Sequence, residues 1–143
     1  MKIKIFAILA LFLLTTAITH SQELVDWEVK VYYDLVQKGT SLPDDAIDMD
    51  YYRIYHIIAN KHDITLGMVR NIALRAQEAL TSQEQKIFNE LEERLEPLDE
   101  SADQERKIIW QKMRDKYNLS QDVLEDIAFR GLKLSQDESQ QKE

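Results

Sequence analysis

The feature that most constrains this chain is that part of it occurs twice. Residues Tyr55–Ala76, YHIIANKHDITLGMVRNIALRA, align without a gap with Trp110–Gly131, WQKMRDKYNLSQDVLEDIAFRG, when the chain is shifted by 55 positions. The agreement includes apolar positions, a lysine, an arginine, and the hydroxyl residues Thr65 and Ser120. Self-similarity at a fixed spacing is typical of tandem structural units. The sequence therefore predicts two copies of one building block.

Each copy has the pattern of two helices joined by a tight turn. In the first copy, Val69, Ile72 and Ala76 recur at steps of three and four, which is the spacing of one face of an α-helix. Thr65 and Ser120 are candidate N-caps, because a hydroxyl oxygen accepts a hydrogen bond from the free N–H groups at a helix start. Thr81, with Glu84 three residues later, has the spacing of a capping box. The chain also holds only three glycines and two prolines, so little interrupts its helices.

The rest of the chain extends this pattern to six helices. The expected helices cover about residues 23–38, 48–61, 65–80, 81–96, 101–117 and 120–134. Gly39 is expected to cap the end of the first helix. We predict an all-α fold of two tandem three-helix units, about 24–78 and 79–133, offset by 55 residues. At this offset Tyr33 lies opposite Phe88.

The two units are expected to form a single domain over residues 22–134. A three-helix unit of this size has only a small core of its own, so the two units gain by packing together. The tail over residues 135–143, SQDESQQKE, has no apolar residue. We therefore predict that the tail is disordered.

Residues 1–21 have the pattern of a secretory signal peptide. Two lysines precede the uncharged apolar run Ile5–Ile18, which is followed by small and polar residues. This run is shorter than the roughly 20 apolar residues that span a bilayer, so an uncleaved membrane anchor is the weaker alternative. We expect cleavage after Ser21, with a cut after Ala17 as the competing site. The mature protein is then expected to be soluble and exported, either periplasmic or secreted.

The charge of the expected mature chain argues against nucleic acid as a partner. Without the two lysines of the signal peptide, 16 Lys and Arg remain against 26 Asp and Glu, so the net charge changes from −8 to −10. Such a charge repels polyanions. DNA-binding helix-turn-helix proteins place the start of the second helix in the major groove. The second copy has Asp122, Glu125 and Asp126 there.

The sequence offers no recognisable catalytic or metal-binding set of residues. It has no cysteine, hence no disulfide or lipid-modified cysteine, and no Gly-x-Ser-x-Gly motif. His56 and His62 are six residues apart, which puts them on different sides of one helix. Four aspartates over residues 44–50 invite a calcium interpretation, but the glycine and distal glutamate of an EF-hand are missing. We interpret them as a solvated helix start, and expect no enzyme activity, cofactor or metal.

Aromatic residues are too numerous in the first unit to share one inward face. We predict that some fill the seam between the units or form a surface for a partner. The residues in question are Trp27, Tyr32, Tyr33, Tyr51, Tyr52 and Tyr55.

Arg75 and Arg130 occupy equivalent positions in the two copies. We predict structural salt bridges from these arginines to Asp48 and Asp103. An anionic ligand is the alternative partner for both guanidinium groups.

The first copy resembles a segment of the YdbL-like small exported proteins, whose function is unassigned. The resemblance rests on the Tyr-x-x-Ile-Ala start and the Val-x-x-Ile-Ala end of Tyr55–Ala76. The second copy departs from the pattern, with Trp110 and Arg114 at two of these positions. The resemblance implies a small exported helical protein and assigns no site residue.

Together these patterns predict a non-enzymatic exported protein. We expect it to act through protein–protein contact, as an interaction or accessory factor of the cell envelope. The alternative is a carrier of a small ligand or metal in a groove between the two units.

Overall fold

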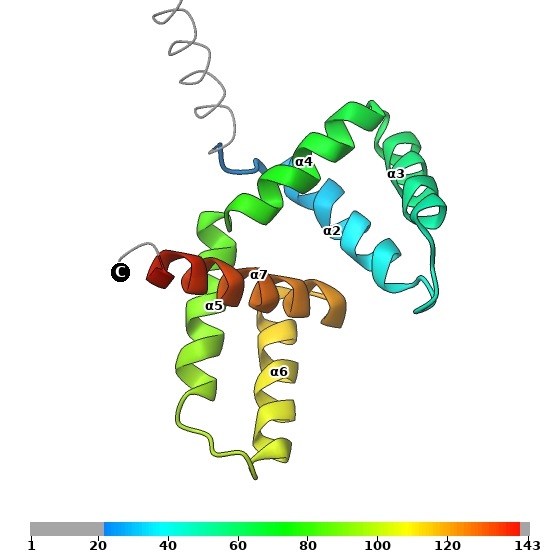
Figure 1. Ribbon diagram of the computed structural model, residues 1–143. Helices are drawn as coiled ribbons and strands as arrows, with labels where there is room; N and C mark the ends of the chain where they lie inside the picture. The colour runs from blue at the N-terminus through cyan, green and yellow to red at the C-terminus, as the bar shows by residue number, and fades with distance from the viewer. Residues whose placement is uncertain (1–21, 141–143) are drawn as a thin grey trace, which may run out of the picture.

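The computed structural model describes residues 22–140, and this part of the chain is all-helical (Figure 1). Its helices are α2 (Asp26–Thr40), α3 (Asp48–His62), α4 (Leu66–Glu78), α5 (Ser82–Leu95), α6 (Asp103–Tyr117) and α7 (Gln121–Gln140). The predicted all-α class is thereby confirmed. The predicted signal peptide lies outside the described residues. Within 22–140, no helix is both long enough and apolar enough to cross a membrane.

The predicted hydroxyl caps start three of these helices. The Thr65 hydroxyl accepts a hydrogen bond from the Met68 N–H at 3.2 Å, and the Ser120 hydroxyl accepts one from the Val123 N–H at 3.3 Å. Thr81 begins α5 with a reciprocal capping box, because its N–H donates to the carboxylate of the third helical residue, which is a glutamate. Each cap satisfies N–H groups that have no partner within the helix.

The two tight turns have the same backbone geometry. Asp63 after α3 and Asn118 after α6 both have φ 52°, in the left-handed region that Asp and Asn tolerate better than most residues. The next N–H in each turn donates back to a carbonyl five residues earlier, from Ile64 to Ala59 and from Leu119 to Arg114, both at 3.0 Å. Every pair of equivalent positions in these turns is 55 residues apart.

Two clusters of apolar side chains form the core, one in the first half of the domain (α2–α4) and one in the second (α5–α7). Val31, Ile58 and Ile72 are at the centre of the first cluster. The second is built from buried residues of α5, α6 and α7, namely Ile87, Phe88, Leu91, Met113, Val123, Leu124 and Ile127. Tyr33 and Val36 of α2 pack against both clusters. Helix α2 also packs along α7, so the halves are joined through α2.

The equivalence between the halves changes by one residue in their first helices. Helices α2 and α5 begin 56 residues apart, whereas α3 and α6, and α4 and α7, begin 55 apart. Helix α5 has 14 residues and α2 has 15, which accounts for the difference. At the spacing of the helix starts, Phe88 lies opposite the buried Tyr32. At the spacing of the helix ends, Thr40 and Leu95, it lies opposite Tyr33, as at the offset of 55.

Two predicted helix ends are also wrong. Gly39 does not cap α2, which continues to Thr40. The tail predicted to be disordered from residue 135 is helical as far as Gln140, where the described residues end. Ser135 and Ser139 donate to the carbonyls four residues earlier, both at 2.9 Å. Lengthening an existing helix avoids the cost of nucleating a new one, so a polar segment without Gly or Pro continues it.

Candidate functional site

An apolar groove of about 230 Å³ lies among α2, α3 and α4. Mostly apolar and aromatic walls with a few polar groups are typical of binding pockets. We call this one the tyrosine groove. It is lined by Tyr32, Leu35, Val36, Gly39, Tyr51, Ile54, Tyr55, Ala73 and Gln77.

Each helix contributes one row of side chains to the groove, because residues three and four apart share a helix face. Tyr51 and Tyr55 form the row from α3, and Ala73 and Gln77 form the row from α4. The row from α2 ends at Gly39, where a Cβ atom would have no heavy atom within 4 Å. Gly39 has no side chain, so there is open space beside the backbone at this end of the row.

Several apolar residues at the start of α3, next to Tyr51 in the sequence, are exposed. Tyr51, which lines the groove, is 48% exposed, and Ile47, Met49 and Tyr52 beside it in the sequence are also exposed. The Tyr52 ring contacts the ring of His56 edge-on, with centroids 4.6 Å apart. Contiguous exposed apolar surface next to a groove is characteristic of interaction sites.

Some of the surplus aromatic residues lie at the seam between the halves, as predicted, and others are exposed. Tyr32 is buried and Tyr33 is half-buried, and both lie where the first half meets the second. Tyr51 and Tyr52 are on the surface instead. Trp27 is exposed too, at the start of α2 and away from the groove lining.

The floor of the groove is fixed by hydrogen bonds. The Tyr32 hydroxyl donates to Oδ1 of Asp126 and accepts from Nε2 of Gln77, both at 3.0 Å. Burial raises the pKa of Tyr32 well above its ordinary value, so the hydroxyl stays neutral. The floor is therefore an uncharged surface held in one orientation.

A buried ion cluster lies beneath Tyr32 and joins the two halves. The Arg130 guanidinium donates to Glu84 at 2.6 Å, to Asp126 at 2.8 Å and to the Ala76 carbonyl at 2.9 Å. Its central carbon lies 4.8 Å from the centre of the Tyr32 ring. The side chains of Arg130 and Glu84 are each only 1% exposed. This cluster links α2, α4, α5 and α7.

The predicted salt bridges from the arginines to Asp48 and Asp103 are wrong. Arg75 pairs with Glu28 and donates from Nε to Asn71 at 2.9 Å. Arg130 makes the corresponding pair of contacts within the second half, to Glu84 and Asp126. The reason is that the last turn of α4 and the middle of α7, where Arg130 lies, approach the starts of α2 and α5 rather than those of α3 and α6. Both guanidinium groups are thus engaged by protein acceptors, not left for an anionic ligand.

A second pair of similar clusters joins the first and second helices of each half. Asp34 bonds Lys61 at 2.6 Å and His62 at 2.7 Å. Burial raises the pKa of Asp34, but hydrogen bonds from these two residues outweigh this effect, so the pKa lies below its ordinary value. His62 is the last residue of α3, and His56 is an exposed residue of the same helix. The two histidines contact different partners and do not converge.

Glu90 occupies the position of Asp34 in the second half and gives a testable pH dependence. Hydrogen bonds from Lys116, Tyr117 and Arg94 lower the pKa of Glu90 from 4.5 to about 2. Because the pKa is lowered in the folded state, this stabilisation is complete above pH 4.5 and disappears as the pH falls through 2. We expect Glu90→Gln to be less stable at pH 7 and to lose less stability than the original protein between pH 4.5 and 2.

The measurement for Glu90→Gln is urea unfolding at a series of pH values. Glu93→Gln is the matched control, because Glu93 is exposed on the same helix. Its stability is expected to follow that of the original protein. An equally steep acid loss in Glu90→Gln would contradict the role of this cluster.

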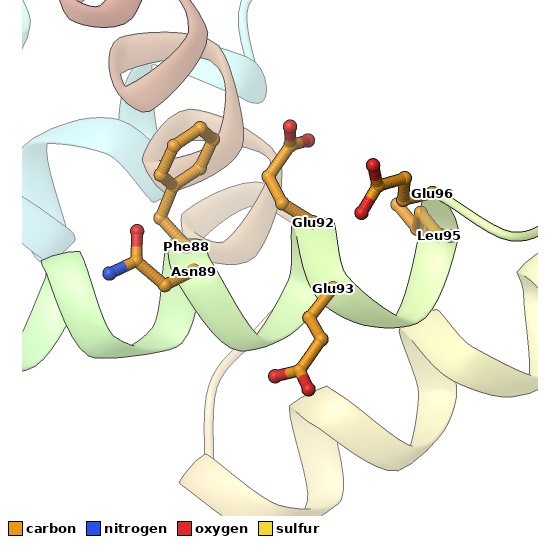
Figure 2. A pocket seen from close by; sticks show the side chains of 6 residues that line it. All are labelled: Phe88, Asn89, Glu92, Glu93, Leu95 and Glu96. Carbon is orange, nitrogen blue, oxygen red and sulfur yellow. The ribbon is translucent and has the colours of Figure 1, made fainter.

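A wider hollow follows the outer side of α5 and differs in character (Figure 2). Three glutamates line it together with Phe88, Asn89 and Leu95. In Figure 2 the carboxylates of Glu92 and Glu93 point in opposite directions, so they do not form a cage. Across the described part of the chain, no group of three or more acidic or histidine side chains is placed to hold a metal ion.

A third hollow lies at the edge of the seam between the halves. Glu23, Lys30 and Tyr33 line it from the first half, and Thr81 and Tyr117 are among its residues from the second. It is broad and lined by mixed polar and apolar residues, in contrast to the tyrosine groove.

Comparison of the chain with protein families, curated proteins and solved structures gave no match. A function has therefore to be inferred from the residues and their geometry.

Proposed function

We propose that this protein is an exported, non-enzymatic binding module of the cell envelope, which holds a segment of a partner protein in the tyrosine groove. The observation that carries the proposal is that Tyr51 both lines the groove and is 48% exposed, among other exposed apolar residues at the start of α3. Burying apolar surface contributes about 25 cal/mol per Å², and tyrosines are enriched among the residues that dominate binding energy. A protein partner would bind such a surface by burying it, without any chemical reaction.

The polar groups of the groove support binding rather than chemistry. They are tyrosine hydroxyls and the amide of Gln77, which already donates to the hydroxyl of Tyr32. Hydroxyl and amide groups of this kind orient a partner by hydrogen bonding. General acid–base catalysis instead needs a group whose pKa is near the working pH.

The test is capture of partners from an envelope extract by the immobilised protein. We expect a captured protein whose recovery falls about 10-fold with Tyr51→Ala, the effect of losing a residue that dominates an interface. Trp27→Ala is the control, because it removes an exposed aromatic residue outside the groove. Recovery that is the same for all three proteins, or no captured protein, would refute the proposal.

The alternative function is small-ligand carriage between the halves, and the hollow lined by Lys30, Tyr33 and Tyr117 favours it. Thermal unfolding with a panel of small molecules separates the two functions. A compound that raises the melting temperature of Tyr51→Ala as much as that of the original protein would favour the alternative.

We further infer that the halves are two copies of one structural unit. The matching turns at Asp63 and Asn118 support this, as do the matching hydroxyl caps. The arginine contacts support it as well, since in each half the arginine of the third helix bonds a glutamate in the first turn of the first helix.

A further inference from the structure

Resting on the proposed function, we infer that the partner segment is a cationic amphipathic helix. It places one or two aliphatic side chains in the tyrosine groove and sets lysine or arginine side chains against the aspartates beside the groove. Amphipathic helices commonly bind by laying an apolar face in a groove between helices of the receptor. The size of the groove and the charge of its rim carry the inference.

The size of the groove suits side chains rather than a whole small molecule. Its volume of about 230 Å³ is below the roughly 300–1,000 Å³ typical of small-molecule pockets. The exposed apolar residues outside it extend the contact surface along α3. An occupant that fills the groove and also covers this surface has to be elongated and apolar on one side, as an amphipathic helix is.

The charge beside the groove is negative. The segment SLPDDAIDMDYY (residues 41–52), which leads into α3 and ends with Tyr51 and Tyr52, has four aspartates and no basic residue. Asp44, Asp45 and Asp48 are exposed. Asp48 is three residues before Tyr51, so the two side chains share the face of α3 that borders the groove.

Most of this negative charge is not neutralised within the protein. Asp50 pairs with Arg53 at 3.4 Å. Among the salt bridges of residues 22–140, none involves Asp44, Asp45 or Asp48. Basic residues also lie close by: Lys38 is next to Gly39, and the Arg70 guanidinium lies 5.9 Å from the centre of the Tyr52 ring. Arg130, beneath Tyr32, is already paired with Glu84 and Asp126. A partner with positive charge around its apolar face would complement the three exposed aspartates.

The charge inference is tested with three designed helical peptides of about 18 residues, a length of about 27 Å as a helix. They share one leucine face and carry lysine, glutamine or glutamate on the other face. Binding to the purified protein is measured by fluorescence anisotropy at low and high salt. We expect the lysine peptide to bind about 10-fold more tightly than the glutamine peptide at low salt, and the advantage to shrink at high salt. The glutamate peptide is expected to bind most weakly.

The location is tested by filling the groove without harming the fold. Gly39→Leu adds a side chain into open space within a helix. Gly67→Leu is the matched control: it is also helical, lies outside the groove, and a Cβ there meets only the Thr65 hydroxyl at 3.8 Å. We expect Gly39→Leu to weaken both the lysine and the glutamine peptide about 10-fold, and Gly67→Leu to weaken neither.

The aspartates are tested with the triple variant Asp44→Asn, Asp45→Asn, Asp48→Asn. It is expected to remove most of the advantage of the lysine peptide while leaving the glutamine peptide unchanged. Because the whole chain is acidic, salt-sensitive binding that Gly39→Leu leaves intact would be general attraction and would overturn the inference. Equal binding of the lysine and glutamine peptides, or binding of no peptide, would overturn it as well. If Tyr51-dependent capture from the extract still occurs in that case, the proposed function stands and only the partner chemistry is wrong.

Discussion

Arg130→Met is expected to destabilise the protein by about 3–5 kcal/mol, the usual cost of removing one partner of a buried ion pair. The substitution removes the guanidinium that Glu84 faces at 2.6 Å and leaves that carboxylate without its cation in a site that is 1% exposed. It also leaves the Ala76 carbonyl without the donor at 2.9 Å. Urea unfolding at pH 7 measures the change in the free energy of unfolding.

Two further variants distinguish this cause from general damage. Arg75→Met makes the equivalent change in the first half, where the arginine and its glutamate partner are 9% and 12% exposed. Water therefore reaches the abandoned Glu28 more easily, and we expect a smaller loss, about 1–3 kcal/mol. The double variant Arg130→Met, Glu84→Gln removes the stranded charge and is expected to recover part of the loss. A loss below about 1 kcal/mol for Arg130→Met would show that the cluster does not bear on stability.

Gly131→Ala is the second large effect, and here two contributions oppose each other. Alanine is favoured over glycine within a helix by about 1 kcal/mol. At Gly131, however, an added Cβ would lie 2.4–2.6 Å from three atoms of the Phe88 ring. Phe88 is buried among the residues of the second core cluster, so its ring has little room to move. Overpacking costs about 1–3 kcal/mol or more, and we expect a net loss of about 1–2 kcal/mol.

Gly39→Ala is the matched control, because the same change there meets no atom within 4 Å. It is expected to raise the free energy of unfolding by up to about 1 kcal/mol. Adding Phe88→Leu to Gly131→Ala should relieve the clash and make the pair of substitutions less costly than their sum. Equal or greater stability of Gly131→Ala alone would mean that the ring yields freely, against the packing described above.

The sequence predicted the features of the fold that are set locally. Apolar residues at steps of three and four located the helices, and Thr65, Thr81 and Ser120 located three of their starts, because capping involves neighbours along the chain. The prediction of a disordered tail was wrong because composition alone describes a segment as if it were isolated. Residues 135–140 instead extend a helix that packing has already formed.

Features that depend on how helices cross were not predictable in this way. Pairing Arg75 with Asp48 is as reasonable from spacing as pairing it with Glu28, and only the approach of α4 to the start of α2 decides between them. The one-residue change of register was hidden because Leu91 matches an apolar residue at either offset, Val36 or Leu35.

The only sequence signal for the tyrosine groove was the excess of aromatic residues. That excess predicted that some tyrosines lie outside the core, but gave no way to choose Tyr51 over Tyr33. Gly39 was predicted to cap α2, whereas it lines the groove that three helices form, with open space beside it. A groove assembled from rows on different helices has no linear motif.

Tyr32 has a consequence for how the domain can be divided. Tyr32 lines the floor of the groove, and its ring also contacts Arg130 of the last helix. Its hydroxyl is held by Asp126, 94 residues further along the chain. The tyrosine groove therefore depends on residues of both halves. Cutting the chain between its halves would separate Tyr32 from Asp126 and Arg130, and we expect the groove to lose its geometry in the isolated first half.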